Sequence, residues 1–183
     1  MKKRGMSNLV FVDCEAYGPG PLHGTLTEFG AVHYESRATF HGLIYRSRFV
    51  EGGNGALEKP TQDDLVEEAE SVFGRFDSWL DGICRGSRLT FVSDNPAFDW
   101  QWINDGLWEA AGRNLFGFSA RRIGDFYAGL KNNWYDTQGW KRFRVTPHDH
   151  NPVNDALGNV EAFERILRQA SGVKEETSDD KKG

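Results

Sequence analysis

The sequence predicts an α/β fold in which a mixed, five-stranded-type sheet is flanked by helices. Short apolar segments that end in polar residues are typical of buried strands, and longer segments with apolar residues every three or four positions are typical of helices. The predicted strands come first and then alternate with helices, an order that suits a mixed sheet covered by helices. A chain of 183 residues, 38% hydrophobic and 13% aromatic, is long enough for one domain with a sizeable core.

The individual elements follow from local patterns. Strands are predicted at residues 9–12, 26–34, 39–50 and 89–92, with a hairpin at the polar link 35–37. A helix is predicted to begin at Thr61, where Asp64 completes a capping-box pattern, and to continue through an apolar stripe that ends at Ile83. Further helices are predicted after Asn95, at about residues 120–130, and after Asn151. Residues 1–172 form the predicted domain, and the charged segment 173–183 is a predicted disordered tail.

Two carboxylates follow the first strand directly. Asp13 and Glu15 are separated by one residue, so in an extended chain they point to the same face while Cys14 points to the other. Two neighbouring like charges repel each other, and a divalent cation such as Mg²⁺ or Mn²⁺ removes that repulsion. The alternative is that a strand ends here and both acids face water, which is common for an isolated Asp-x-Glu pair.

The same helix opening occurs twice in the second half of the chain. Asn95-Pro96-Ala97-Phe98-Asp99 and Asn151-Pro152-Val153-Asn154-Asp155 both place a cap residue before Pro and an acid in the first turn. The helix dipole stabilises an acid in that position, so each opening alone is explained as an ordinary first turn. That explanation does not account for the repetition, or for the histidine, His150, before the second opening.

Composition restricts the class of protein and its location. With 22 basic and 27 acidic residues the net charge is −5, so nucleic acid binding would require local basic groups or metal ions. The sequence contains no apolar run that approaches a membrane span, and the basic start lacks a signal-peptide apolar region. Cys14 and Cys84 have neither zinc nor redox spacing, and we expect buried thiols in a cytoplasmic protein.

Taken together, these motifs resemble those of a known enzyme family. Asp13 and Glu15, then the segment from Asn95 to Asp99, then His150 with Asp155 and Ala156, are similar to the three motifs of the DEDDh exonucleases. These are DnaQ-like 3′–5′ exonucleases of the ribonuclease H-like superfamily. The resemblance extends from Leu9 to about Leu167, and it includes Gly30-Ala31-Val32 preceded by Glu28. One departure is Ala16-Tyr17, where family members often carry Thr or Ser.

The resemblance implies a two-metal-ion mechanism. Asp13, Glu15, Asp99 and Asp155 would hold two divalent cations, Mg²⁺ or Mn²⁺, and His150 would be the general base. The product would be a 5′-mononucleotide released from the 3′ end of DNA or RNA. Spacing favours His150 over His148, which we interpret as a loop residue, and Asp99 over Asp94, which we interpret as a turn acid. Relatives occur as monomers and as homodimers, and both states stay open.

Contacts to the nucleic acid are expected beside these residues. The candidates for binding the terminal nucleotide are Ala16, Tyr17, Leu22, Asn95, Phe98 and Trp100. Aromatic residues of this kind are also common core residues. Lys141, Arg142 and Arg144, interleaved with tryptophans, are candidates for the phosphate backbone, although a solvated loop explains them equally well. Two alternative functions are an oligoribonuclease-like phosphoesterase for very short substrates and a non-catalytic nucleic-acid-binding accessory module.

Overall fold

A five-stranded sheet forms the centre of the protein. The computed structural model describes residues 6–53 and 55–172, and the strand order within these residues is β3-β2-β1-β4-β5. β1 runs antiparallel to β2 and parallel to β4, so the sheet is mixed. The strands are β1 Leu9–Tyr17, β2 Thr25–His33, β3 Thr39–Leu43, β4 Thr90–Ser93 and β5 Ala120–Arg122. This architecture confirms the predicted α/β class and is consistent with a ribonuclease H-like fold.

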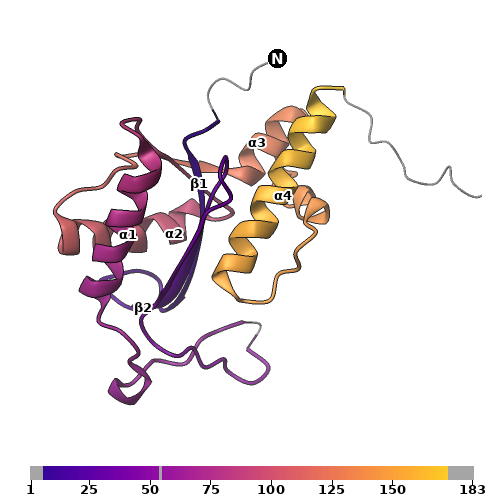
Figure 1. Cartoon of the computed structure of the whole chain (residues 1–183). Helices are drawn as coiled ribbons and strands as arrows, with labels where there is room; N and C mark the ends of the chain where they lie inside the picture. The colour runs from indigo at the N-terminus through magenta and orange to yellow at the C-terminus, as the bar shows by residue number, and fades with distance from the viewer. Residues whose placement is uncertain (1–5, 54, 173–183) are drawn as a thin grey trace, which may run out of the picture.

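Helices cover both faces of the sheet. α1 (Ala69–Cys84) and α2 (Pro96–Ala111) lie on one face, and α3 (Ile123–Leu130) and α4 (Pro152–Ala170) lie on the other (Figure 1). Two short 3₁₀ helices, η1 (Gln62–Asp64) and η2 (Gly139–Phe143), lie in the connections. The central strand β1 is therefore buried between two apolar layers, which explains why its first half reads as a continuous apolar run.

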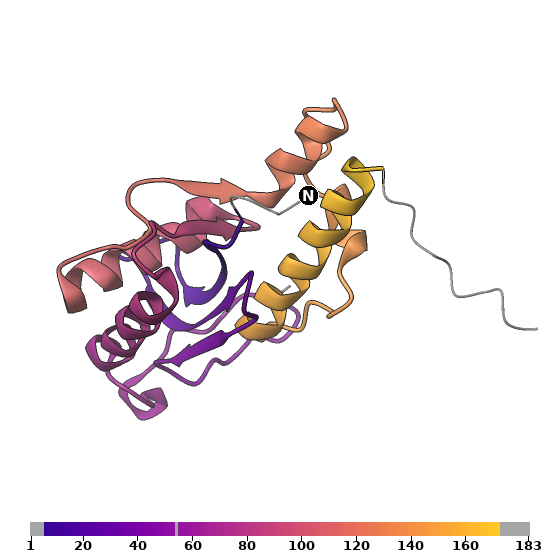
Figure 2. The ribbon, with the colours of Figure 1, turned by 45° about the horizontal axis from the view of Figure 1, so that its top comes forward.

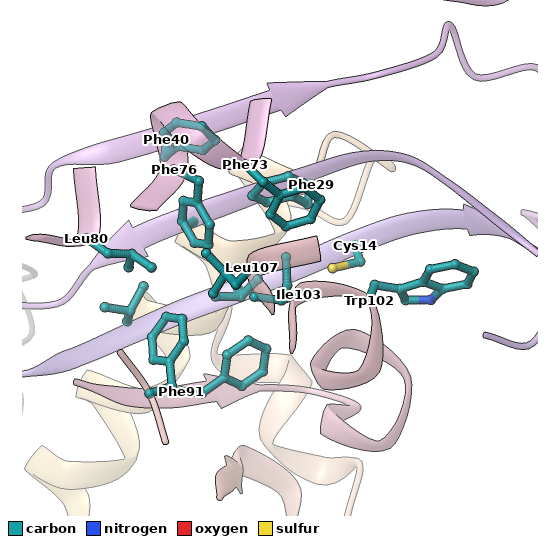
Figure 3. Close-up of a cluster of buried hydrophobic side chains, with 14 of the residues drawn as sticks. Cys14, Phe29, Phe40, Phe73, Phe76, Leu80, Phe91, Trp102, Ile103 and Leu107 are labelled. Carbon is teal, nitrogen blue, oxygen red and sulfur yellow. The ribbon is translucent and has the colours of Figure 1, made fainter. Parts of the chain in front are cut away.

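The two faces of β1 have different neighbours. Val12 and Cys14 point into the larger core on the α1 and α2 face, where Phe29 stacks on Phe73 with ring centroids 5.1 Å apart (Figure 3). Phe11 points to the opposite face and packs with α3 and α4. Because the side chains alternate, Asp13 and Glu15 share the α4 face with Phe11, as the sequence predicts.

Several predicted boundaries are wrong. The first strand does not end at residue 12 but continues to Tyr17, and the strand predicted over residues 39–50 ends at Leu43. The capping box at Thr61 is present, but it opens the short η1 rather than the long helix, which begins separately at Ala69. The helix predicted from residue 120 begins with β5, and the chain then passes directly into α3 (Figure 2).

A glycine on β2 allows α4 to approach the sheet closely. A Cβ atom on Gly30 would lie 2.3 Å from the Val153 nitrogen and from the Pro152 carbonyl carbon at the start of α4. Both atoms belong to the backbone, so no side-chain movement would relieve that overlap. Gly30 therefore sets the distance at which the first turn of α4, and Asp155 within it, lies against β1 and β2.

The predicted tail, residues 173–183, lies outside the described residues. Among the residues that the structure describes, no helix has the length and apolar character required to cross a membrane. Cys14 is buried and Cys84 is half-buried, and neither forms a disulfide.

Candidate active site

Three carboxylates from distant parts of the chain meet on the α4 face of the sheet. Oxygen atoms of Asp13, Glu15 and Asp155 all lie within 4.8 Å of one another. β1 supplies the first two because its side chains alternate, and α4 supplies the third from its first turn. The α4 opening has the predicted geometry, since the Asn151 side chain accepts hydrogen bonds from the Val153 and Asn154 amides.

Asp155 is the most deeply buried member of the cluster. Its side chain is 0% exposed, and neither carboxylate oxygen accepts a hydrogen bond from the described residues. The nearest basic side chains are His148, whose Nδ1 lies 2.7 Å from Oδ2, and Arg144, whose Nη1 lies 3.6 Å from Oδ1. A fully buried carboxylate without hydrogen bonds is costly, and coordination of a cation is the usual remedy. The cluster therefore fits a divalent metal site.

Burial and mutual repulsion raise the proton affinity of the cluster. Burial, together with the charges of Asp99, Asp155 and Glu15, raises the pKa of Asp13 well above its ordinary value. Burial, followed by the charges of Asp155 and Glu28, raises the pKa of Glu15 to about 7. Cations that coordinate these oxygens would stabilise the charged forms and oppose both effects.

Asp99 lies next to this cluster, in the first turn of α2. Its side chain is 4% exposed, and its Oδ1 accepts a hydrogen bond of 3.2 Å from the Cys14 amide, which lies between the two β1 acids. Burial raises the pKa of Asp99 to about 7. Asp94 lies farther out and forms an ion pair of 2.6 Å with Lys141. The structure thus places Asp99 beside Asp13 and gives Asp94 a different partner.

Both histidines before α4 reach the carboxylates. Nδ1 of His150 lies 3.4 Å from Oε1 of Glu15, and the centroid of its ring lies 4.5 Å from that of His148. His148 was interpreted from spacing as a loop residue, but its Nδ1 makes the short contact with Asp155. His150 has a φ of 60°, in the left-handed region that histidine adopts more often than most other non-glycine residues.

A cleft of about 480 Å³ opens beside Asp13. Lys141 and Arg144 line it together with Asp94 and His148. Arg144 is only 10% exposed, donates a hydrogen bond to Asn159 and lies 3.6 Å from Asp155, whereas Lys141 is 44% exposed at the rim. Arg142 does not line the cleft, and its guanidinium donates a hydrogen bond of 3.0 Å to the Tyr127 hydroxyl. The three basic residues that the sequence grouped together therefore have different surroundings.

The predicted contacts to the terminal nucleotide are also dispersed. Ala16 and Tyr17 are half-buried at the end of β1, and Leu22 in the following loop is 87% exposed. Asn95 is exposed and caps α2 without a side-chain hydrogen bond. Phe98 packs edge-to-face on Trp102 with centroids 6.0 Å apart. Trp100 packs edge-to-face on Phe91 and Phe116, and this packing accounts for it as a core residue.

A bacterial protein is similar to this chain over most of its length. No protein-family model matches the chain. The chain is similar to the "3'-5' DNA exonuclease Cap18" of Escherichia coli, with 26% identity over 182 aligned residues. The alignment covers 86% of this chain and 90% of that protein, so the similarity is not confined to one motif.

Proposed function

We propose that this protein is a metal-dependent 3′–5′ exonuclease that hydrolyses phosphodiester bonds of DNA and releases 5′-mononucleotides. The observation that carries the proposal is the convergence of Asp13, Glu15 and Asp155 within 4.8 Å, with the carboxylate of Asp155 fully buried. The similarity to a 3′–5′ DNA exonuclease supports this activity and favours DNA as the substrate.

Asp13, Glu15, Asp99 and Asp155 would hold two divalent cations, Mg²⁺ or Mn²⁺. Carboxylate oxygens are the ligands that both ions prefer. Bound there, the cations would supply Lewis-acid chemistry, lowering the pKa of water and neutralising charge on the leaving 3′ oxygen. Asp99 differs from the other three because one of its oxygens already accepts the Cys14 amide hydrogen bond, which fixes the carboxylate orientation.

His150 is the proposed general base. Its imidazole lies at the edge of the cluster, half-buried, with Nδ1 near Glu15. A neutral imidazole can accept a proton from water and then pass it to solvent. His148 would have a separate role, because its ring faces Asp155 and leaves the Glu15 side to His150.

Lys141 is the proposed contact to a backbone phosphate. It lies at the rim of the cleft beside Asp13, and its ammonium group is paired with Asp94 in the described structure. Exchange of this partner for a phosphate would keep the ion pair while placing the strand next to the carboxylates. An ammonium group contacts phosphates without regard to sequence, which suits an exonuclease.

The test is hydrolysis of matched 5′-labelled and 3′-labelled DNA and RNA strands with Mg²⁺ or Mn²⁺. The wild-type protein should shorten 5′-labelled DNA in single steps and release labelled mononucleotide from the 3′ end. Asp155→Asn should abolish hydrolysis while the circular dichroism spectrum is retained. Asp105→Asn, which changes an exposed acid on α2, is the matched control and should keep wild-type activity.

Three outcomes would contradict the proposal or part of it. Normal metal-dependent hydrolysis by Asp155→Asn would remove the assigned site. Cleavage confined to dinucleotides and other very short strands would favour the phosphoesterase alternative. DNA binding without cleavage under any divalent cation would favour a non-catalytic module.

A further inference from the structure

The segment that follows β3 packs against the imidazole of His150. After β3 the chain doubles back on itself over residues 46–53 and 55–58, which we call the 46–58 hairpin. It lies below the N-terminal end of α4 in Figure 1, and an antiparallel bridge joins Phe49 to Leu57. Backbone hydrogen bonds between its two sides run from the Val50 amide to the Ala56 carbonyl and from the Glu58 amide to the Arg48 carbonyl, both 2.8 Å.

The hairpin is fixed to the body of the protein at its base. The Arg48 guanidinium forms an ion pair of 2.5 Å with Asp64, and the Arg46 amide donates to the Asp64 carbonyl at 2.8 Å. Asp64 is 3% exposed and accepts hydrogen bonds from the backbone amide and the hydroxyl of Thr61. These hydrogen bonds hold the pKa of Asp64 below its ordinary value, so the carboxylate stays charged and the anchor persists at neutral pH.

Two residues of the hairpin touch the imidazole of His150. The centroid of the Phe49 ring lies 5.1 Å from that of the imidazole, at an interplanar angle of 46°. On the opposite strand of the hairpin, a Cβ atom on Gly55 would lie 2.6 Å from Cε1 and 3.0 Å from Nε2 of His150. Gly55 also has a φ of +83°, which disfavours any other residue. The backbone of Gly55 therefore packs closely against the ring.

We infer that Phe49 and Gly55 are positioning residues that hold the imidazole of His150 toward Glu15. The inference rests on the proposed function, in which His150 is the general base. The Nδ1 contact of His150 with Glu15, at 3.4 Å, is too long to fix the ring by itself. The His148 ring lies 4.5 Å from it, centroid to centroid, and the anchored hairpin adds the contacts of Phe49 and Gly55.

The test compares Phe49→Ala with Val50→Ala. Both side chains are 43% exposed and adjacent in the hairpin, but Phe49 is the one whose ring contacts His150. Phe49→Ala should lower kcat on DNA about ten- to hundredfold with little change in KM, since small misplacements of a catalytic group have effects of that size. Phe49→Tyr should restore most of the loss, and Val50→Ala should match the wild type.

Two further measurements separate this inference from the proposed function. In a His150→Ala background, Phe49→Ala should have no additional effect on kcat, because the group it positions is absent. Nuclear magnetic resonance of the His150 ring, with no substrate present, should show a changed chemical shift in Phe49→Ala and none in Val50→Ala. An unchanged ring signal, or equal loss of activity in the two backgrounds, would overturn the inference. A wild-type protein that does not cleave DNA but shows the ring effect would overturn only the proposed function.

Discussion

Replacement of Glu15 should stabilise the metal-free protein at neutral pH. The folded protein raises the pKa of Glu15 from 4.5 to about 7, mainly by burial, so its ionised form is disfavoured in the native state. Because a tenfold change in proton affinity is worth about 1.4 kcal/mol, this change corresponds to about 3 kcal/mol. Glu15→Gln removes the charge and keeps the shape of the side chain. The variant should therefore exceed the wild type in free energy of unfolding by about 3 kcal/mol above pH 7.

The direction of the pH dependence follows from the raised pKa. Below about pH 4.5 Glu15 is protonated in both the folded and unfolded states, so its ionisation contributes little to the difference in free energy of unfolding between wild type and variant. As the pH rises toward 7, the unfolded state releases the proton first and the wild type loses stability. The difference between the two proteins should grow by about 2 kcal/mol between about pH 5 and about pH 7.5.

Urea unfolding in the presence of a chelator measures this difference. Each protein is unfolded at several pH values in that range, and the free energies are compared at equal ionic strength. Mn²⁺ at a hundred times Kd should then remove most of the difference, since a bound ligand adds about 2.7 kcal/mol to the wild type and the variant has lost one ligand. If the difference in free energy of unfolding between wild type and variant does not change with pH, the argument that burial disfavours the ionised form of Glu15 is refuted.

The remaining predictions concern other parts of the same site. His150→Ala should lower the hydrolysis rate about a hundredfold to ten-thousandfold, the usual scale for a general base, and a pH–rate profile identical to wild type would contradict the role. Arg144→Gln should destabilise the metal-free protein by about 3 kcal/mol in urea, because it removes a cationic neighbour of a fully buried carboxylate, and added Mn²⁺ should recover part of the loss. Gly30→Ala should cost about 2 kcal/mol in thermal unfolding, because α4 must move, and an unchanged melting temperature would mean that α4 adjusts freely. Lys141→Gln should raise KM for DNA and flatten its salt dependence while leaving kcat unchanged, which steady-state kinetics at several salt concentrations would check.

The parts of the site that the sequence predicted depend on local rules. Alternation along a strand places Asp13 and Glu15 on one face, and a Pro at the first helical position places Asp99 and Asp155 in first turns. Each rule involves only a few neighbouring residues, so it can be applied without knowledge of the tertiary contacts. The meeting of these residues from three elements was not a local inference and came from the resemblance to the exonuclease motifs.

The features that the sequence did not reveal depend on contacts between distant residues. β5 has only three residues, two of them arginines, so its apolar pattern is too short to be distinguished from the start of α3. The strand prediction over residues 39–50 failed because Ile44, Tyr45 and Phe49 favour extended structure, yet ladder pairing ends at Leu43. The contact of Phe49 with His150 joins residues about a hundred positions apart, and no periodic pattern in the sequence indicates it.

An acidic protein that acts on nucleic acid requires its charges to be arranged locally. The net charge of the chain is −5, and at physiological ionic strength the influence of its exposed charges fades beyond about 8 Å. The buried carboxylates repel a phosphate at short range, but they are also the groups that would gather cations, so binding of metal would change the sign of the field at the site. DNA affinity should therefore depend on divalent cations far more than on bulk charge. Equal DNA binding with and without Mn²⁺, measured on Asp155→Asn and wild type, would show instead that surface residues such as Lys141 are sufficient.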